Sequence, residues 1–343
     1  MANSEQIRPG FIDGAPAGNF GGGLYEVLLP ELGERKKGKV RDAYVVGGKR
    51  VMITTDRQSA FNAMIGTIPD KGKVLNLISA YWFGETSDIV PNHVIAVPHP
   101  NVLVARQVQR LGVEVVLRDY MAKSSSSTSV YRNYTEGGRR QIYGIRFPEG
   151  LKANERFPMG TIITPTTKSE DDEELTDQQA RNIVDSASKN GTWEEVKRSA
   201  QAVFARGREQ YGQKGLILAD TKLEFGVDEN GDLVLIDEIL TPDSSRFWQA
   251  STYQALFEEG KDPETFDKEL LRKWLADRGF KGRGEVPELD DAIRNQMKEV
   301  YISLYERATG ALLPNTPSTV EAIRTSIAPY LQITNSTQER SLG

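Results

Sequence analysis

Acidic side chains gather between residues 220 and 246. The carboxylates are Asp220, Glu224, Asp237, Glu238 and Asp243, and Lys222 and Arg246 lie among them. Because alternate residues of a strand share a face, a strand here would bring Asp220, Lys222 and Glu224 together. Magnesium binds carboxylate oxygens together with nucleotide phosphates, so Glu224 and Asp237 on adjacent strands could form such a site. An exposed, salt-bridged hairpin is the alternative explanation of the same residues.

A turn at residues 240–246, with the sequence Leu-Thr-Pro-Asp-Ser-Ser-Arg, follows this acidic stretch. The hydroxyls of Ser244 and Ser245 and the guanidinium of Arg246 are donors suited to a phosphate or a carboxylate. A Pro-Asp turn with no ligand would use the same residue types. The segment therefore predicts an anion site without excluding a structural turn.

The segment Gly38-Lys39-Val40-Arg41-Asp42 places two cations at alternate positions of a predicted strand. Lys39 and Arg41 would then share one face, from which they could hold nucleotide phosphates. The P-loop pattern G-x-x-x-x-G-K-[ST] is absent, and no predicted helix follows the glycine run at 21–23, so neither standard phosphate loop is present. A solvated cluster of charges is the alternative.

Two hairpins are predicted to position these residues. The first joins residues 40–46 to 50–55 through Gly47-Gly48, and the second joins 216–219 to 233–236 through the Asn230-Gly231 step. The apolar runs 102–108 and 113–117 predict a further pair of strands. Apolar residues at intervals of four predict a helix over 73–83.

Further helices are predicted on both sides of the second hairpin. Thr176 with Gln179 and Thr192 with Glu195 resemble capping boxes that begin two helices. The apolar stripe from residue 289 to 304, which ends before Gly310, predicts a C-terminal helix. Residues 124–129 and 132–140 are polar and turn-rich and predict a loop or lid, while the Gly- and Pro-rich residues 1–23 predict a flexible arm.

The composition narrows the class of protein. The 343 residues carry 43 basic and 48 acidic side chains, a net charge of −5, mixed along the chain, so nucleic acid is not an expected partner. Cysteine is absent, which excludes disulfides, thiolate metal sites and a cysteine nucleophile. No signal peptide or membrane span is predicted, and we expect a cytoplasmic protein.

Several blocks of the sequence closely resemble the SAICAR synthetase family of purine biosynthesis, and they occur in the order of that family. They are Gly38–Asp42, Thr55–Phe61, Pro69–Gly72, Pro165–Lys168, Ala219–Gly226 and Ile236–Trp248. The resemblance extends from Gly38 to Gly310. It is strongest from Asp237 to Trp248.

The resemblance implies an α+β fold in which two lobes clamp ATP, in the manner of ATP-grasp enzymes and kinases, with C-terminal helices completing the substrate side. We predict a flexible arm over residues 1–23 and a β-rich ATP-binding lobe over 24–112. A central α+β lobe with the Mg-ATP and substrate residues would follow over 113–260, and a helical segment over 261–343.

The family joins the carboxylate of carboxyaminoimidazole ribotide to the amine of L-aspartate and splits ATP into ADP and phosphate. A carboxylate is a poor electrophile, so its conversion to an acyl phosphate supplies a leaving group before the amine attacks. The resemblance therefore implies an ATP-dependent carboxylate–amine ligase that uses ATP and Mg²⁺ and acts on these two small molecules. It implies no oligomeric state.

Site residues are carried over position by position. The residues implied for Mg-ATP are Lys39, Arg41, Lys168, Lys222, Glu224 and Asp237, with Glu224 and Asp237 as the metal ligands. The residues implied for the substrates are Ser59, Asn62, Arg118, Ser124, Asp243, Ser244, Ser245, Arg246, Lys268 and Arg272. Lys39, Lys222 and Arg246 are predicted to act in catalysis.

Among the positions that depart from the family pattern, two leave a second substrate open. Asn62 stands where the family usually has aspartate, and Lys123 stands where it usually has glycine. The alternative reaction is that of a diverged paralogue, which ligates an amine to a related carboxylated heterocycle in nucleoside natural-product synthesis. An alternative of another class is a nucleotide-binding protein without catalysis, although the presence of Lys39, Glu224 and Asp237 argues against it.

Overall fold

The computed structural model describes residues 18–331 except 21, 62, 125, 127, 170 and 171. Asn62 and most of the predicted N-terminal arm therefore lie outside the described residues. The last residues of that arm are ordered, because β1 (Gly18–Phe20) pairs with β2 (Gly23–Glu26). None of the helices in the described ranges is long and apolar enough to cross a membrane.

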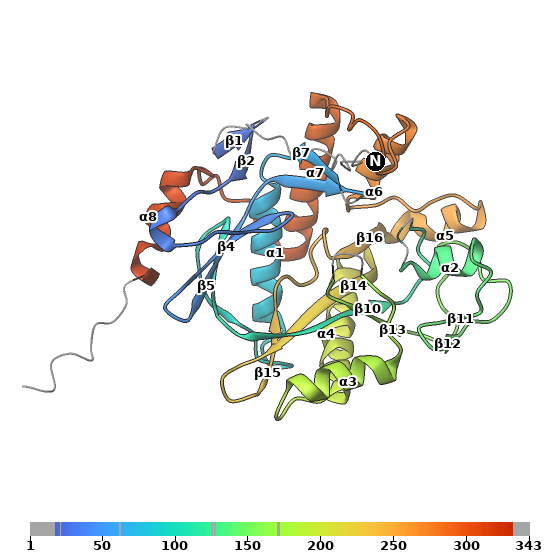
Figure 1. Ribbon diagram of the computed structural model, residues 1–343. Coiled ribbons are helices and arrows are strands. Elements are labelled where there is room, and N and C mark those ends of the chain that lie inside the picture. Colours follow the sequence, from blue (N-terminus) through green and yellow to red (C-terminus); the bar gives the residue numbers. More distant parts are fainter. Residues whose placement is uncertain are drawn as a thin grey trace, which may run out of the picture.

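An antiparallel five-stranded sheet is built from the first third of the chain. Its spatial order is β3 (Lys36–Lys37), β4 (Arg41–Val46), β5 (Lys49–Thr54), β9 (Val102–Arg106) and β8 (Val94–His99). The predicted hairpin is confirmed as β4–β5, with Gly47 and Gly48 both at positive φ. One face packs on helix α1 (Lys71–Glu85) and the other on α8 (Val320–Leu331) (Figure 1).

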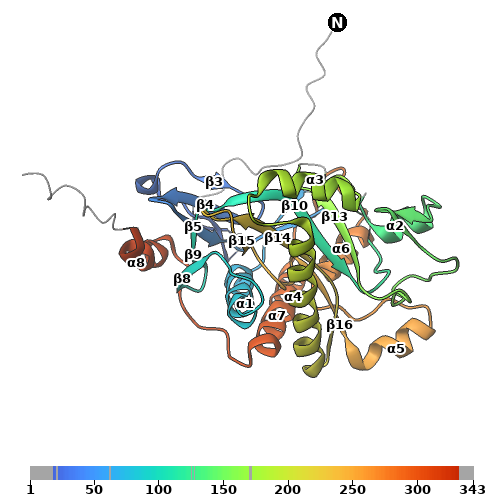
Figure 2. The same ribbon diagram turned by 90° about the horizontal axis from the view of Figure 1, so that it is seen from below.

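A second antiparallel sheet carries the acidic stretch. Its order is β13 (Ile162–Thr167), β10 (Gln109–Arg118), β14 (Leu216–Val227) and β15 (Leu233–Ile236), and β16 (Ser245–Gln249) pairs with the other end of β14. The predicted acidic hairpin is present as β14–β15, but its first strand was placed wrongly: β15 pairs with residues 224–227, whereas the predicted residues 216–219 belong to the part of β14 that pairs with β16. Helices α3 (Asp177–Ala187) and α4 (Trp193–Gln213) pack against this sheet (Figure 2). The predicted capping box is confirmed at Thr176 with Gln179, whereas at Thr192 the side chain accepts the hydrogen bond from Glu195 N without the reciprocal bond of a capping box.

Two predictions of local structure were wrong. The runs 102–108 and 113–117 form strands, but β9 and β10 belong to different sheets and do not pair with each other. The chain passes from one sheet to the other between Arg106 and Gln109. The region 132–140 is not wholly irregular, because Ser129 caps the short helix α2 (Val130–Thr135), and β11 (Gln141–Ile142) and β12 (Ile145–Arg146) follow it.

The remaining elements surround the two sheets. They are the 3₁₀ turn at Pro30–Leu32, the hairpin β6 (Arg57–Ala60) and β7 (Ala63–Thr67), and the helices α5 (Ala250–Glu258), α6 (Glu269–Asp277) and α7 (Asp291–Thr309). The predicted C-terminal helix is confirmed as α7, which ends at Gly310 in the left-handed conformation. It packs beside α1 (Figure 1).

The largest hydrophobic core joins the predicted segments. It contains residues of α1, of the second sheet with α4, and of α7, for example Trp82, Phe204 and Met297. The strand β10 begins at Gln109 and runs through Gly112, where one segment was predicted to end. The division at residues 112 and 260 stays a prediction.

Candidate active site

Two carboxylates and two ammonium groups form a closed ring across β10 and β14. Glu114 on β10 lies opposite Glu224 on β14, and both side chains are buried. Lys168, which directly follows β13, donates to Glu114 and also to Glu224 at 2.6 Å. The Nζ of Lys222 lies 2.7 Å from Glu114 Oε1 and 4.0 Å from Glu224 Oε1. Opposite charges alternate around the ring, which offsets the cost of burying them.

The ring shifts the pKa values of its members. Burial raises the pKa of Glu224, and the negative charge of Asp237 raises it further, in opposition to the lysines. Burial lowers the pKa of Lys222, but Glu114 and Glu224 together outweigh this effect and the pKa lies above its ordinary value. The pKa of Lys168 is raised in the same way by Glu224 and Glu114, against burial. Both lysines are therefore cationic at neutral pH and suited to phosphate oxygens.

A third carboxylate adjoins the ring where β15 ends. Ile236 is paired with Glu224, so Asp237 emerges directly beside that residue. Asp237 has a φ of 68°, an uncommon conformation for a residue other than glycine. Burial by itself raises the pKa of Asp237, but Arg41 and the two lysines of the ring lower it to about 2. The strained turn thus presents an ionised carboxylate next to Glu224.

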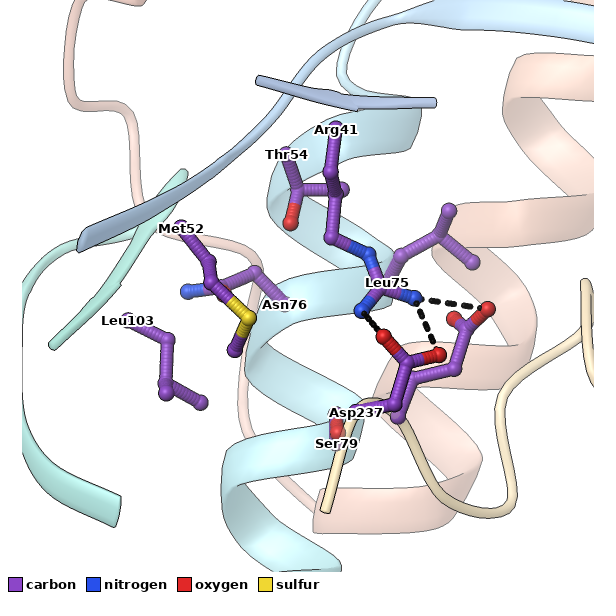
Figure 3. Close-up of a pocket in the computed structure, with 9 residues that line it drawn as sticks. Arg41, Met52, Thr54, Leu75, Asn76, Ser79, Leu103 and Asp237 are labelled. Atoms are coloured by element: carbon purple, nitrogen blue, oxygen red, sulfur yellow. Dashed lines mark hydrogen bonds and ion pairs between the residues drawn. The ribbon is translucent and has the colours of Figure 1, made fainter. Parts of the chain in front are cut away.

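The guanidinium of Arg41 fills the space in front of this turn (Figure 3). Its Nη1 lies 2.5 Å from Asp237 Oδ1, and its Nη2 lies 2.8 Å from Glu238 Oε1. A cavity of about 10 Å³ beside the pair, lined in part by Asn76, is the size of one water molecule. This cavity is therefore too small for a phosphate group.

The residues around Glu224 and Asp237 fit a divalent cation. Burial raises the pKa of Glu224, repulsion by the neighbouring Asp237 adds to that rise, and a shared cation would relieve the repulsion. Within the described ranges, no group of three or more His, Cys, Asp or Glu side chains is arranged to hold a metal. Magnesium that takes one or two carboxylates and completes its shell with phosphate and water oxygens suits such a pair.

Lys39 lies at the exposed edge of the same region. Its backbone carbonyl accepts a hydrogen bond from Arg57 Nε at 3.2 Å, which fixes the chain just before Arg41. Burial and Glu114 raise the pKa of the Asp172 carboxyl, whereas Lys222, Lys168 and Lys39 lower it. Lys39 therefore shares the electrostatic surroundings of the ring.

Two arginines predicted to bind substrate converge on one buried aspartate. Arg246 holds Asp220 with Nε 3.0 Å from Oδ1 and Nη2 2.5 Å from Oδ2. Arg118 donates to the same Oδ2 at 3.1 Å and to Thr164 at 2.9 Å. Burial raises the pKa of Asp220, but the two arginines outweigh it and keep the carboxyl ionised. Together, the two arginines and the aspartate carry one net positive charge beside the ring.

Asp243 is the centre of a third cluster. Lys71 donates to its Oδ2 at 2.8 Å, and Tyr301 of α7 donates to its Oδ1 at 3.1 Å. Burial raises its pKa, but Lys71 and then Lys268 lower it well below the usual range. Both carboxylate oxygens are held by the protein, so Asp243 ties the turn to α1 and α7.

The turn hydroxyls are used inside the protein. Ser245 Oγ lies 2.8 Å from Thr221 Oγ1, and Ser244 Oγ lies 3.1 Å from Thr241 Oγ1. Both serines are buried. The turn is therefore held by its own hydrogen bonds, as expected for a structural turn. Arg246 beside it points to Asp220.

The other predicted substrate residues surround these clusters. Lys268 precedes α6 close to Asp243, and burial lowers its pKa. Arg272 donates to Glu269 at 2.9 Å, and its Nε is buried without a partner among the described residues. Ser59 lies half-buried on β6. Ser124 accepts a hydrogen bond from Ser126 N and directly follows Lys123, whose carbonyl accepts from Arg246.

Comparison with known proteins decides the family. The family model described as SAICAR synthetase matches residues 34–289, which span both sheets and, apart from Tyr301, all members of the three clusters. The chain belongs to the SAICAR synthetase family. The predicted α+β fold of this family is thereby confirmed, and solved structures of SAICAR synthetases share it.

Individual relatives support this assignment over most of the chain. A phosphoribosylaminoimidazole-succinocarboxamide synthase of Legionella pneumophila is 44% identical over 289 residues, which cover 84% of this chain and 91% of that protein. The Bacteroides fragilis enzyme is 39% identical over 303 residues, covering 86% and 93%. The structure of the Saccharomyces cerevisiae SAICAR synthase complexed with SAICAR matches with a TM-score of 0.71, 30% identity and coverage of 84% and 98%.

Sequence reasoning missed three residues of these clusters in this SAICAR synthetase family member, and the partners of a fourth. Asp220 was placed on the correct strand face, but it was not recognised as the partner of both arginines. Glu114 and Lys71 are buried charges, and an acidic residue within an apolar strand was a usable signal for the first. Tyr301 gave no signal, because an aromatic residue on the apolar face of a helix is usually part of the core.

Proposed function

We propose that this SAICAR synthetase family member joins L-aspartate to the carboxylate of carboxyaminoimidazole ribotide and converts ATP to ADP and phosphate, a step of purine biosynthesis. The observation that carries this proposal lies on one face of β14. Asp220 there holds Arg118 and Arg246, and Glu224 lies four residues further along the same strand. At about 3.3 Å per residue these groups are about 13 Å apart, so an anionic substrate and a nucleotide can bind side by side.

The chemistry follows from charge. A carboxylate oxygen of the ribotide attacks the γ-phosphorus of ATP, the bond from that phosphorus to the β-phosphate oxygen breaks, and ADP leaves. The amine of aspartate then attacks the acyl carbon, the bond from carbon to the phosphate oxygen breaks, phosphate leaves, and the nitrogen loses a proton. Both steps bring anions together, so the protein acts mainly by positioning them and neutralising their charge.

The roles of the residues follow from their clusters. Lys168 and Lys222 of the ring, with Lys39 and Arg41 at its edge, face the ATP phosphates. Arg118 and Arg246 hold the ribotide, and Lys268 and Arg272 are cations left for its phosphate or for the carboxylates of aspartate. Lys39, Lys222 and Arg246 stabilise charge that develops during phosphoryl transfer. When bound, Mg²⁺ would be held by Glu224 and Asp237 and would neutralise phosphate charge.

Three further residues and the compartment complete the proposal. We assign Ser59, Ser124 and Asn62 to the ribotide, as their positions in the family pattern imply. We place the enzyme in the cytoplasm, in keeping with a chain that has no cysteine.

Substrate omission with the purified protein tests this function. ADP release should require ATP, MgCl₂, the ribotide and L-aspartate together. Leaving out either the ribotide or L-aspartate should abolish the release. Release with another carboxylated heterocycle, but not with this pair, would favour the diverged paralogue. Nucleotide binding with no release under any pairing would favour a protein without catalysis.

A further inference from the structure

Glu114 is a buried anion that lies outside the set of residues assigned to ATP, metal or substrate. Its side chain belongs to β10 and is 3% exposed, and the equally buried Glu224 lies directly opposite it on β14. Like charges directly opposite each other across a sheet destabilise it. Glu114 therefore needs cations to be tolerated at this position, and its presence calls for an explanation beyond packing.

The two lysines that neutralise Glu114 are the two that face the nucleotide in the proposed function. Lys222 is held mainly by Glu114, because its Nζ is 2.7 Å from that carboxylate and 4.0 Å from Glu224. Lys168 is shared, since it donates to both carboxylates. Glu224 is thus engaged by an ammonium group, although it is also one of the two carboxylates that fit the metal.

A cation that binds Glu224 must compete with Lys168. If Glu114 were absent, both lysines would have Glu224 as their remaining carboxylate in the ring, and the competition would be harder. With Glu114 present, the lysines keep an anionic partner after Glu224 is taken. The ring therefore contains a second carboxylate to which its ammonium groups can remain attached.

We propose that Glu114 is a positioning residue that retains Lys168 and Lys222 beside the nucleotide phosphates and so makes Glu224 available to the metal. This inference rests on the proposed function. It concerns the magnesium concentration that nucleotide binding requires and does not depend on which carboxylated heterocycle is the substrate.

The test measures ADP binding by titration calorimetry over a range of MgCl₂ concentrations. Glu114→Gln keeps the size and one acceptor oxygen of the side chain but removes its charge. We expect the MgCl₂ concentration for half of the maximal effect to rise about tenfold, which is about 1.4 kcal/mol, while ADP binding in EDTA does not weaken. Glu114→Asp keeps the charge with a shorter reach, and the MgCl₂ concentration that it requires should lie between those of the wild type and Glu114→Gln.

Asp177→Asn is the matched control. Asp177 on α3 also accepts a hydrogen bond from a lysine, Lys197, at 2.8 Å, but it does so on an outer helix. The same MgCl₂ requirement in Glu114→Gln as in the wild type would overturn the inference. If circular dichroism shows that Glu114→Gln is unfolded, Glu114→Asp alone decides. A MgCl₂ requirement of Glu114→Asp equal to that of the wild type would then overturn the inference. Failure of the wild type to bind ADP at any MgCl₂ concentration would instead reject the proposed function.

Discussion

The guanidinium of Arg41 and the carboxylate of Asp237 form a two-pronged ion pair, with Nη1 2.5 Å from Oδ1 and Nη2 3.3 Å from Oδ2. They lie 196 positions apart in the sequence, at the start of β4 and at the end of β15. The pair thus connects the two sheets at the point where Mg-ATP is proposed to bind. Arg41 thereby supplies positive charge to the acidic turn of Asp237 and Glu238.

Arg41→Gln should therefore destabilise the protein and make it more responsive to magnesium. Loss of the guanidinium leaves Asp237, Glu238 and Glu224 short of a cation, and we expect the free energy of unfolding to fall by about 2 kcal/mol. MgCl₂ should raise the melting temperature of this variant more than that of the wild type. Arg206→Gln is the control, because Arg206 makes a similar two-pronged pair with Asp88 on the surface. Equal magnesium effects on all three proteins would contradict the account.

Asp237→Asn should reduce turnover by about a hundredfold at saturating substrates. The amide keeps the shape of the side chain but cannot offer an anionic oxygen to the metal. Steady-state ADP release measures the effect. Asp228→Asn, at the far end of the same β14–β15 hairpin, should leave turnover near that of the wild type. Similar turnover in the wild type and Asp237→Asn would show that this carboxylate does not serve the metal.

Asp220→Asn should weaken ribotide binding in particular. The amide is uncharged, and its NH₂ group cannot accept a hydrogen bond from a guanidinium, so Arg118 and Arg246 lose the anion and one of the two acceptor oxygens that fix their orientation. We expect the KM for the ribotide to rise at least about tenfold while the KM for ATP changes less than about threefold. Asp119→Asn is the control, since Asp119 pairs with Arg208 and accepts from Thr161 outside the substrate cluster. An equal rise in both KM values would mean that Asp220 supports the site only as a whole.

Asp267 should make stability fall as pH rises toward neutrality. Burial raises the pKa of this carboxyl from 3.8 to about 7, although backbone N–H groups of Glu269 and Phe247 act in the opposite direction. Because the pKa is higher in the folded protein, the stabilisation is complete below the unfolded pKa of 3.8 and is lost as pH rises through 7.

The comparison of wild type with Asp267→Asn isolates this effect from other titrations. Urea unfolding at several values between about pH 5 and pH 8 should show the wild type losing stability relative to the variant as the pH increases. A relative gain of wild-type stability over that range would reverse the sign and reject the assignment.

The strands and helices that carry periodic patterns could be predicted from the sequence. The β14–β15 hairpin followed from its Asn-Gly turn, and α7 followed from its apolar stripe and Gly310. Pairing between strands was less accessible, because local patterning does not say which sheet a strand joins. The residues of β9 and β10 illustrate this, since the chain leaves one sheet between them.

The residue types of the site were accessible, but their contacts with one another were not. Alternation along β14 placed Asp220, Lys222 and Glu224 on one face. The sequence could not reveal that Tyr301, from a helix 58 positions later, reaches Asp243, because such a contact depends on tertiary packing. Nor could it reveal that Glu114 sits opposite Glu224, since the register of two distant strands is set by the whole sheet.

The most direct test of the proposed reaction follows the carboxylate oxygen. Carboxyaminoimidazole ribotide labelled with ¹⁸O in its carboxylate is incubated with ATP, MgCl₂ and L-aspartate, and the released phosphate is analysed by ³¹P NMR. Transfer through an acyl phosphate predicts one ¹⁸O atom in each phosphate formed, together with SAICAR and ADP. Formation of SAICAR with unlabelled phosphate, or no SAICAR from this pair of substrates, would contradict the account.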